Sequence, residues 1–318
     1  MPRARALSSR DQIVVGLTED WLVSATDDAF ACFRRSLELT GLQESLVADR
    51  QAKVRAAAEG RLAVSASFLT GSYRRHTLIT PLREADVDIM IVLDRDYRRR
   101  GARAVLELVK SALHETYPSS RISRNGQAVT ITFADFTVDV VPAFATRWWE
   151  DDGWDICNSG DDTWIRTNPG KHIELSSKIN QRTGGLLVPA VKMLKAWNRN
   201  AGRPLRSFHL EVLAWKILDP GWFLAGWWGP GVGMGTDPDN VRRFFTEAPA
   251  RLRRKLADPA CGSADVGAYL NGSARQDAIS KIMTAASRCE RADQLRADGN
   301  DAEARRIYRQ VFGDAFPG

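Results

Sequence analysis

The stretch GSYRRHT at residues 71–77, followed by DVDIMIVL at residues 86–93, decides the fold class of this 318-residue chain. The second segment predicts a buried strand, because its residues after the aspartates are apolar and β-branched residues dominate among them. Asp86 and Asp88 stand two residues apart at its start. Side chains of a strand alternate between its two faces, so both carboxylates are expected to project from the same face.

This spacing of carboxylates predicts a metal site. Two carboxylates held side by side repel each other unless a cation lies between them. Their hard oxygen atoms suit Mg²⁺, which keeps several waters and binds through a few carboxylates plus substrate phosphates. The preceding Gly71 and Ser72 fit the same chemistry, because glycine lets the backbone approach a ligand and a hydroxyl with nearby N–H groups holds phosphate oxygens.

A third carboxylate, Asp139, lies in the middle of the β-rich run FTVDVVP at residues 136–142. An aspartate inside such an apolar strand is costly unless it is paired or bound to metal. If this strand lies beside residues 86–93, the three carboxylates can surround two metal ions. That arrangement serves in-line phosphoryl or nucleotidyl transfer. The alternatives are an exposed strand start for Asp86 and Asp88, and an arginine partner for Asp139.

The order of these motifs resembles the nucleotidyltransferase superfamily of the DNA polymerase β type. More narrowly, the chain resembles the bacterial cGAS/DncV-like nucleotidyltransferases, the SMODS family. The narrower resemblance rests on the spelling of residues 71–82 before the aspartate pair and continues through TWIRTNP at 163–169, VKMLKAW at 191–197, SFHLE at 207–211 and FGDAFP at 312–317. It therefore spans nearly the whole chain.

The resemblance implies an α+β fold. A polymerase-β-like core with a mixed sheet and N-terminal helices would occupy residues 1–170. An all-helical, nucleotide-binding domain would occupy residues 171–318, with the active site in the cleft between them. The implied activity is synthesis of a cyclic oligonucleotide second messenger from ATP, GTP or other nucleoside triphosphates, with release of pyrophosphate. In the family, such products activate a separate effector protein in CBASS anti-phage signalling.

The resemblance also assigns roles to individual residues. Asp86 and Asp88 would hold two Mg²⁺ ions, for which Mn²⁺ can substitute, and Asp139 would complete the ion at the acceptor hydroxyl. The donor nucleotide would be bound by Gly71, Ser72, Lys192 or Lys195, Ser207 and Phe208. Of the two lysines, Lys195 matches the family position at the triphosphate, and Phe208 would stack on the donor base. A solvated helix face for the lysines, a turn serine at residue 72 and a core phenylalanine at residue 208 are the alternatives.

Other polar residues near these motifs receive weaker assignments. His76 is taken as a structural or phosphate-side residue, because Asp139 can accept the proton in metal-activated transfer. Arg74 and Arg75 face either phosphate or solvent, and the sequence does not separate these two cases. His209 and Glu211 are taken as packing or helix-surface residues.

Composition bounds the class of protein. The chain carries 45 basic and 39 acidic side chains, a net charge of +6, which fits a partner that is a polyanion but also an ordinary basic cytosolic protein. Its four cysteines form no Cys-x-x-Cys pair, so we expect no zinc module like that of the animal DNA sensor. For the same reason, we expect that no DNA or RNA activator is obligatory. No apolar run reaches the length of a membrane span, and we expect a cytoplasmic monomer.

The remaining pattern predicts the other elements. Helices are expected at 11–23, 27–39, 40–58 and 102–117, and strands at 62–69, 121–124, 127–133 and 136–141. Residues 95–100 are expected to form a charged turn, and residues 148–169 a loop. Helices then follow at 172–183, 185–200, 204–218, 238–257, 273–297 and 301–312. The tryptophans of segment 221–235 are expected to form a packed cluster. The helix at 40–58 is expected to pack through Leu42, Leu46, Val47, Val54 and Ala58.

Two other functions remain open from the sequence. One is a template-independent transferase that makes linear oligonucleotides or tails RNA with the same core chemistry. The other is a catalytically inactive sensor of nucleotides or nucleic acid. The sequence names neither the bases and their order nor the ring size, the 2′–5′ or 3′–5′ linkage, an activating partner or the effector.

Overall fold

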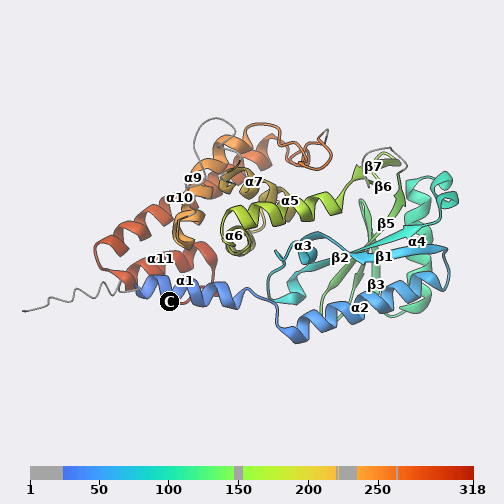
Figure 1. Cartoon of the computed structure of the whole chain (residues 1–318), viewed down its shortest axis with the longest axis horizontal. Coiled ribbons are helices and arrows are strands. Elements are labelled where there is room, and N and C mark those ends of the chain that lie inside the picture. Colours follow the sequence, from blue (N-terminus) through green and yellow to red (C-terminus); the bar gives the residue numbers. More distant parts are fainter. Residues whose placement is uncertain (1–23, 147–152, 220, 222–234, 263) are drawn as a thin grey trace, which may run out of the picture.

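The computed structural model describes residues 24–146, 153–219, 221, 235–262 and 264–318. A mixed sheet with covering helices forms one half of the described chain, and a group of helices forms the other (Figure 1). This arrangement confirms the α+β prediction, with strands in the first part of the chain and helices after them.

The sheet contains seven strands among the described residues, in the order β1-β2-β5-β4-β3, with β6 paired to the end of β5 and β7 paired to β6. Of the strand pairs in the described part of the chain, β2 with β5 is parallel and the others are antiparallel. The strands are β1 (Val64–Leu69), β2 (Asp86–Leu93), β3 (Arg121–Asn125), β4 (Ala128–Thr132), β5 (Thr137–Ala145), β6 (Trp154–Asn158) and β7 (Thr163–Thr167).

One part of the sheet was not predicted. Residues 148–169 were expected to form a loop, but β6 and β7 pair there as a hairpin, with Ile156 opposite Ile165. Both strands are five residues long, and Gly160, Asp161 and Asp162 belong to the turn between them. The expected charged turn at 95–100 is a 3₁₀ helix, η2 (Arg95–Arg100).

Two helices, α2 (Gly41–Glu59) and α4 (Ala102–Thr116), pack with the sheet in one apolar core. The predicted capping box of α2 is present, because Thr40 and Gln43 exchange hydrogen bonds at its start. Leu42 was expected to face the core, yet it is 85% exposed. The buried residues of α2 begin at Val47, so its first turn extends past the core.

The helical half has a second core, built from α5 (Pro169–Arg182), α6 (Leu187–Asn200), α7 (Ser207–Leu218), α9 (Asp237–Leu252), α10 (Gly272–Ala297) and α11 (Asp301–Phe312). The predicted helices at 11–23 and the tryptophans at 222–228 lie outside the described residues. None of the helices in the described ranges is long and apolar enough to cross a membrane.

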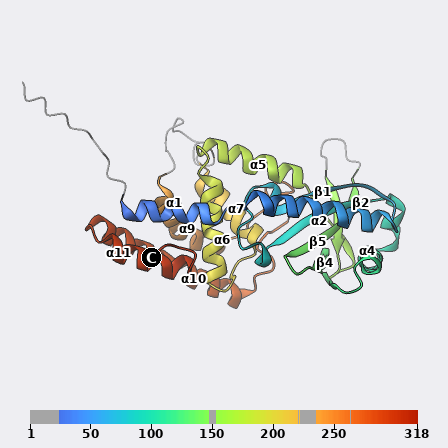
Figure 2. The same ribbon diagram turned by 90° about the horizontal axis from the view of Figure 1, so that it is seen from below.

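Helix α1 (Ala25–Ser36) belongs to this second core, which corrects the expectation that all N-terminal helices pack behind the sheet. The ring of Phe30 lies against those of Tyr308, Phe312 and Phe316, with centroid distances of 4.8, 5.9 and 5.0 Å. Figures 1 and 2 show α1 alongside the C-terminal helices rather than the sheet. Apolar packing therefore overrides sequence proximity in placing α1.

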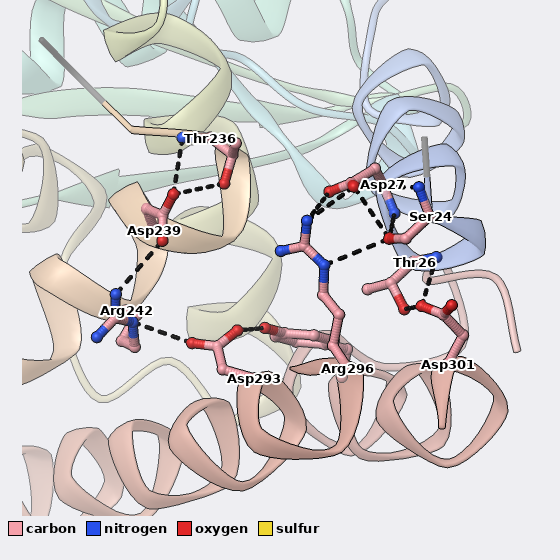
Figure 3. A network of polar contacts seen from close by, with 10 residues as sticks. Ser24, Thr26, Asp27, Thr236, Asp239, Arg242, Asp293, Arg296 and Asp301 are labelled. Carbon is pink, nitrogen blue, oxygen red and sulfur yellow. Dashed lines mark hydrogen bonds and ion pairs between the residues drawn. The ribbon is translucent and has the colours of Figure 1, made fainter. Parts of the chain in front are cut away.

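Polar contacts fix the start of α1 onto α10 and α11 (Figure 3). The guanidinium of Arg296 donates to Asp27 at 2.7 Å, and Asp27 also closes a capping box with Ser24. The backbone N–H of Thr26 donates to Asp301 at 3.2 Å. These contacts join residues about 270 positions apart in the chain.

Candidate active site

The parallel pairing of β2 with β5 brings the three predicted carboxylates to one cleft. Asp88 lies directly opposite Asp139, and Asp86 lies opposite Thr137. All three aspartates line a cleft of about 740 Å³ together with residues of α6 and α7. The expectation that these two strands are neighbours is confirmed.

The carboxylates oppose one another electrostatically. Burial and the neighbouring Asp139 raise the pKa of Asp88 to about 7. The pKa of Asp86 is raised by loss of hydration and then by Asp139. Burial also raises the pKa of Asp139, against the effect of a 2.6 Å hydrogen bond from the Thr130 hydroxyl. Burial therefore raises the pKa of all three carboxylates in the cleft.

The carboxylates line the cleft without converging on one point. Among the described residues, no three His, Cys, Asp or Glu side chains are arranged as a metal-binding group.

Asp88 leaves no room for a side chain at residue 71, which explains the glycine there. Gly71 starts the short helix α3 (Gly71–Arg74) with a φ of +59°. A Cβ atom at residue 71 would lie 1.8 Å from Oδ2 of Asp88. The close approach predicted for this glycine is thus made to a carboxylate of the protein itself. Ser72, the next residue, lines the cleft.

We expect Gly71→Ala to lose at least tenfold in activity, because the added methyl group must displace Asp88 or the 71–77 loop. The matched control is Gly184→Ala, which has a φ of +64° and no atom within 4 Å of its added Cβ. Both variants carry the backbone cost of about 1 kcal/mol for a left-handed conformation. Only Gly71→Ala should lose activity, measured as initial rate at equal folded protein; equal losses in both would contradict this explanation.

In the same cleft as the carboxylates, three buried charged side chains join the 71–77 loop to α6 and α7. The guanidinium of Arg75 donates to both carboxylate oxygens of Glu211, at 2.8 and 3.1 Å. The ammonium of Lys195 lies 2.7 Å from Glu211 and donates to the Thr77 carbonyl at 2.9 Å. Burial alone would raise the pKa of Glu211, but Arg75 and Lys195 outweigh it and lower that pKa to about 2.

This cluster corrects the assignment of Glu211 and gives Arg75 a buried partner. Glu211 was taken as a packing or helix-surface residue, yet its side chain is fully buried in an ion-paired cluster. Arg75 is also buried, whereas Arg74 is exposed, so the two arginines have different surroundings. The signal for Glu211 was present in the sequence, because an acid within the apolar run of α7 needs buried partners.

The remaining predicted nucleotide-binding residues separate into two groups. Lys195, Ser207 and Phe208 line the cleft. Lys192 does not, because its ammonium pairs with Glu38 from the segment after α1. The ring of Phe208 is partly covered by the guanidinium of Arg75, whose central carbon lies 5.3 Å from the ring centroid.

The two histidines named from the sequence lie away from the carboxylates. His76 is exposed, has a φ of 58° and is not among the cleft-lining residues. His209 is buried and contacts the Tyr269 hydroxyl at 3.1 Å, which agrees with a packing role. Further polar side chains that the sequence did not single out as site residues also line the cleft, among them Asn125, Gln127, Arg199 and Arg203.

A family model matches much of this architecture. Residues 25–180, which include all three carboxylates, match the family described as the Second Messenger Oligonucleotide or Dinucleotide Synthetase domain. A cyclic AMP-AMP-AMP synthase of an Acinetobacter species is 25% identical over 274 residues, covering 79% of this chain and 72% of that protein. A cyclic AMP-AMP-GMP synthase of Enterobacter hormaechei is 23% identical over 320 residues, covering 80% and 81%.

Solved structures share the fold. CdnC of Escherichia coli, in its complex with HORMA-deltaN, superposes with a TM-score of 0.72 at 17% sequence identity. The alignment covers 92% of this chain and 98% of that one. At this identity the likeness concerns the fold, which it extends over both the sheet and the helical half.

Proposed function

We propose, from the premise that this chain belongs to the bacterial cGAS/DncV-like nucleotidyltransferases, that it joins nucleoside triphosphates into a cyclic oligonucleotide and releases pyrophosphate. The observation that supports this most strongly is the pairing of Asp88 with Asp139 on parallel strands, with Asp86 on the same side. The three carboxylates share one cleft with a buried arginine and a buried lysine. That combination suits a substrate with both phosphate groups and bound divalent metal.

Two Mg²⁺ ions, or Mn²⁺ in their place, fit the donor set of this cleft. Its carboxylate oxygens are hard ligands, and their raised pKa values reflect burial and repulsion that a cation would relieve. Asp86 and Asp88 would hold both ions and Asp139 would complete one. When bound, such ions activate an attacking hydroxyl and stabilise charge on the reacting phosphate. Substrate phosphates commonly complete the Mg²⁺ shell, which fits carboxylates that do not converge beforehand.

A second set of groups in the same cleft would hold the donor nucleotide. The backbone at Gly71, the Ser72 hydroxyl, Lys195 and Ser207 are proposed to bind its triphosphate. Ser207 is the first residue of α7, where the helix dipole favours negative charge. The Phe208 ring would stack on the base, a contact typically worth ~1–3 kcal/mol.

The reaction joins two nucleotides at a time. A ribose hydroxyl oxygen of the acceptor bonds to the α-phosphorus of the donor, and the bond from that phosphorus to pyrophosphate breaks. Asp139 is the proposed acceptor of the hydroxyl proton. The linear product would rebind in the opposite orientation, and a second bond of the same kind would close the ring.

The proposal extends to the setting of the reaction. We expect a monomer in the cytoplasm that needs no DNA or RNA activator, and a product that acts on a separate effector in anti-phage signalling. Because CdnC has been solved in complex with HORMA-deltaN, a protein partner should also be tested for this chain.

Labelled nucleoside triphosphates test this function directly. Nuclease-treated protein is incubated with Mg²⁺ and each triphosphate, alone and in combination, and the products are treated with phosphatase. A labelled product that survives phosphatase is the expected result, and its mass gives the bases and the ring size. A phosphatase-sensitive product would indicate a linear synthase, and no product under any combination would indicate a sensor or an absent partner such as HORMA-deltaN.

Lys195→Met is expected to weaken binding of a non-hydrolysable triphosphate by ~1.5–3 kcal/mol, the range for a charge-assisted contact. The reason is that this substitution removes a positive charge from the nucleotide side of the cleft. Lys192→Met is the matched control, since it lies one turn away on α6, is equally buried and pairs outside the cleft. Calorimetry should show weaker binding for the first variant only, and the reverse result would move the phosphate site to Lys192.

A further inference from the structure

The two buried cations of the cleft, Arg75 and Lys195, share a single buried anion, Glu211. Arg75 and Lys195 both pair with Glu211, and the three side chains are 7%, 7% and 0% exposed. Their charges sum to one positive unit. Because buried ions need close partners, the direction in which these two cations point depends on where their anion lies.

Asp88 is the competing anion in this region. Its carboxylate lines the same cleft as Arg75, Lys195 and Glu211. Both cations nevertheless turn toward Glu211: Arg75 uses its two-pronged guanidinium, and Lys195 completes its contacts with Thr77. Among the described residues, neither cation forms an ion pair with Asp88.

We propose that Glu211 is a positioning residue that holds Arg75 and Lys195 on the nucleotide side of the cleft and so leaves Asp88 available to a divalent cation. This inference rests on the proposed metal role of Asp88. Glu211 is assigned here neither to the metal nor to the nucleotide. It acts by occupying the two cations that would otherwise neutralise a metal-binding carboxylate.

Removal of the Glu211 charge has a defined consequence. Two buried cations would then lack their carboxylate partner in the cleft that also holds Asp88. An ion pair formed there would compete with the metal for the same oxygens. Glu211→Gln should therefore weaken divalent-cation binding, which a residue with a purely structural role would not do once the protein is folded.

The experiment measures Mn²⁺ binding to the full chain without nucleotide, by the loss of the free-ion signal in electron paramagnetic resonance. Asp86→Asn with Asp88→Asn provides the baseline for the proposed metal site. Glu211→Gln should bind Mn²⁺ at that site roughly tenfold or more weakly than the unmodified chain. This is the size of effect expected when a nearby cation competes for Asp88 in a partly screened environment. Asp219→Asn is the control, because it removes the ion-pair partner of Arg182 at the end of the same helix, outside this cleft.

A compensated variant separates charge balance from folding. Glu211→Gln combined with Lys195→Met restores a net charge of one positive unit and is expected to regain Mn²⁺ affinity within about threefold of the unmodified chain, a difference of about 0.65 kcal/mol. Glu211→Asp keeps the charge on a shorter side chain, so its Mn²⁺ affinity should lie between those of Glu211→Gln and the unmodified chain. If Glu211→Gln does not fold, the compensated variant alone decides the question.

Each outcome has one meaning. Unchanged Mn²⁺ affinity in folded Glu211→Gln overturns the role of Glu211 while leaving the proposed function intact. A compensated variant that is unfolded, or folded with weak Mn²⁺ binding, also overturns it, because restored charge balance is held to be sufficient. If the unmodified chain binds no better than the aspartate double variant, the metal site itself is overturned, together with the proposal for Glu211.

Discussion

Replacement of Asp86 and Asp88 together by asparagine is expected to abolish product formation while the protein remains folded. Both carboxylates lie on one side of β2 in the cleft, and asparagine cannot supply the negative charge that holds divalent metal. Metal catalysis stabilises the transition state by several kcal/mol, and each 1.36 kcal/mol is a factor of ten. We expect a loss of about three orders of magnitude or more in initial rate, measured by pyrophosphate release.

The stability of this double variant provides a second measurement. Since burial and repulsion raise the pKa values of both aspartates, removal of the charges should leave the melting temperature without added metal unchanged or higher. The control is Asp94→Asn with Asp96→Asn, an exposed pair at the same spacing immediately after β2. Retained activity in the folded Asp86 and Asp88 variant would refute the metal assignment.

Asp139→Asn is expected to bind a non-hydrolysable triphosphate with Mg²⁺ and yet to lose turnover by about two to four orders of magnitude, the usual range for a general base. The expected loss lies in kcat, because the proposed proton transfer from the acceptor hydroxyl contributes only in the transition state. The hydrogen bond from Thr130 should hold an asparagine at residue 139 in nearly the same place.

Saturation kinetics beside calorimetry measure this separation of binding from turnover. Asp155→Asn is a suitable control, because Asp155 lies on the adjacent strand β6, pairs with Arg98 and does not line the cleft. If Asp139→Asn instead loses triphosphate binding with normal kcat, the residue serves in substrate binding and another group accepts the proton.

The sequence predicted the three cleft carboxylates because their placement depends on residues close to them in the chain. A period of two along one strand places Asp86 and Asp88 together, and an acid inside an apolar strand draws attention to Asp139. The hairpin of β6 and β7 escaped prediction because its short strands lie next to a polar turn. Leu42 shows the limit of helical periodicity, which indicates a face but not where the neighbouring core ends.

The nucleotide side was harder to predict because it depends on contacts between distant segments. Arg75 and Glu211 are 136 positions apart, and nothing local to either residue identifies its partner. Lys192 and Lys195 share a helical face by sequence, yet one pairs with Glu38 and the other with Glu211. Which lysine faces the cleft depends on how α6 rotates against α1 and α7, which is a property of the assembled core.

The placement of α1 against α11 has a consequence for the order in which the chain folds during synthesis. The sheet with α2 and α4 is built from one continuous segment, residues 41–167, and can assemble as soon as that segment has left the ribosome. Phe30 and Phe33 cannot be packed at that stage, because their aromatic partners lie at residues 308–316. Until those residues are made, α1 carries an uncovered aromatic face, which is a site for chaperone binding or for aggregation. A deletion that removes α11 should accordingly leave the sheet half folded but make the protein prone to aggregate through α1.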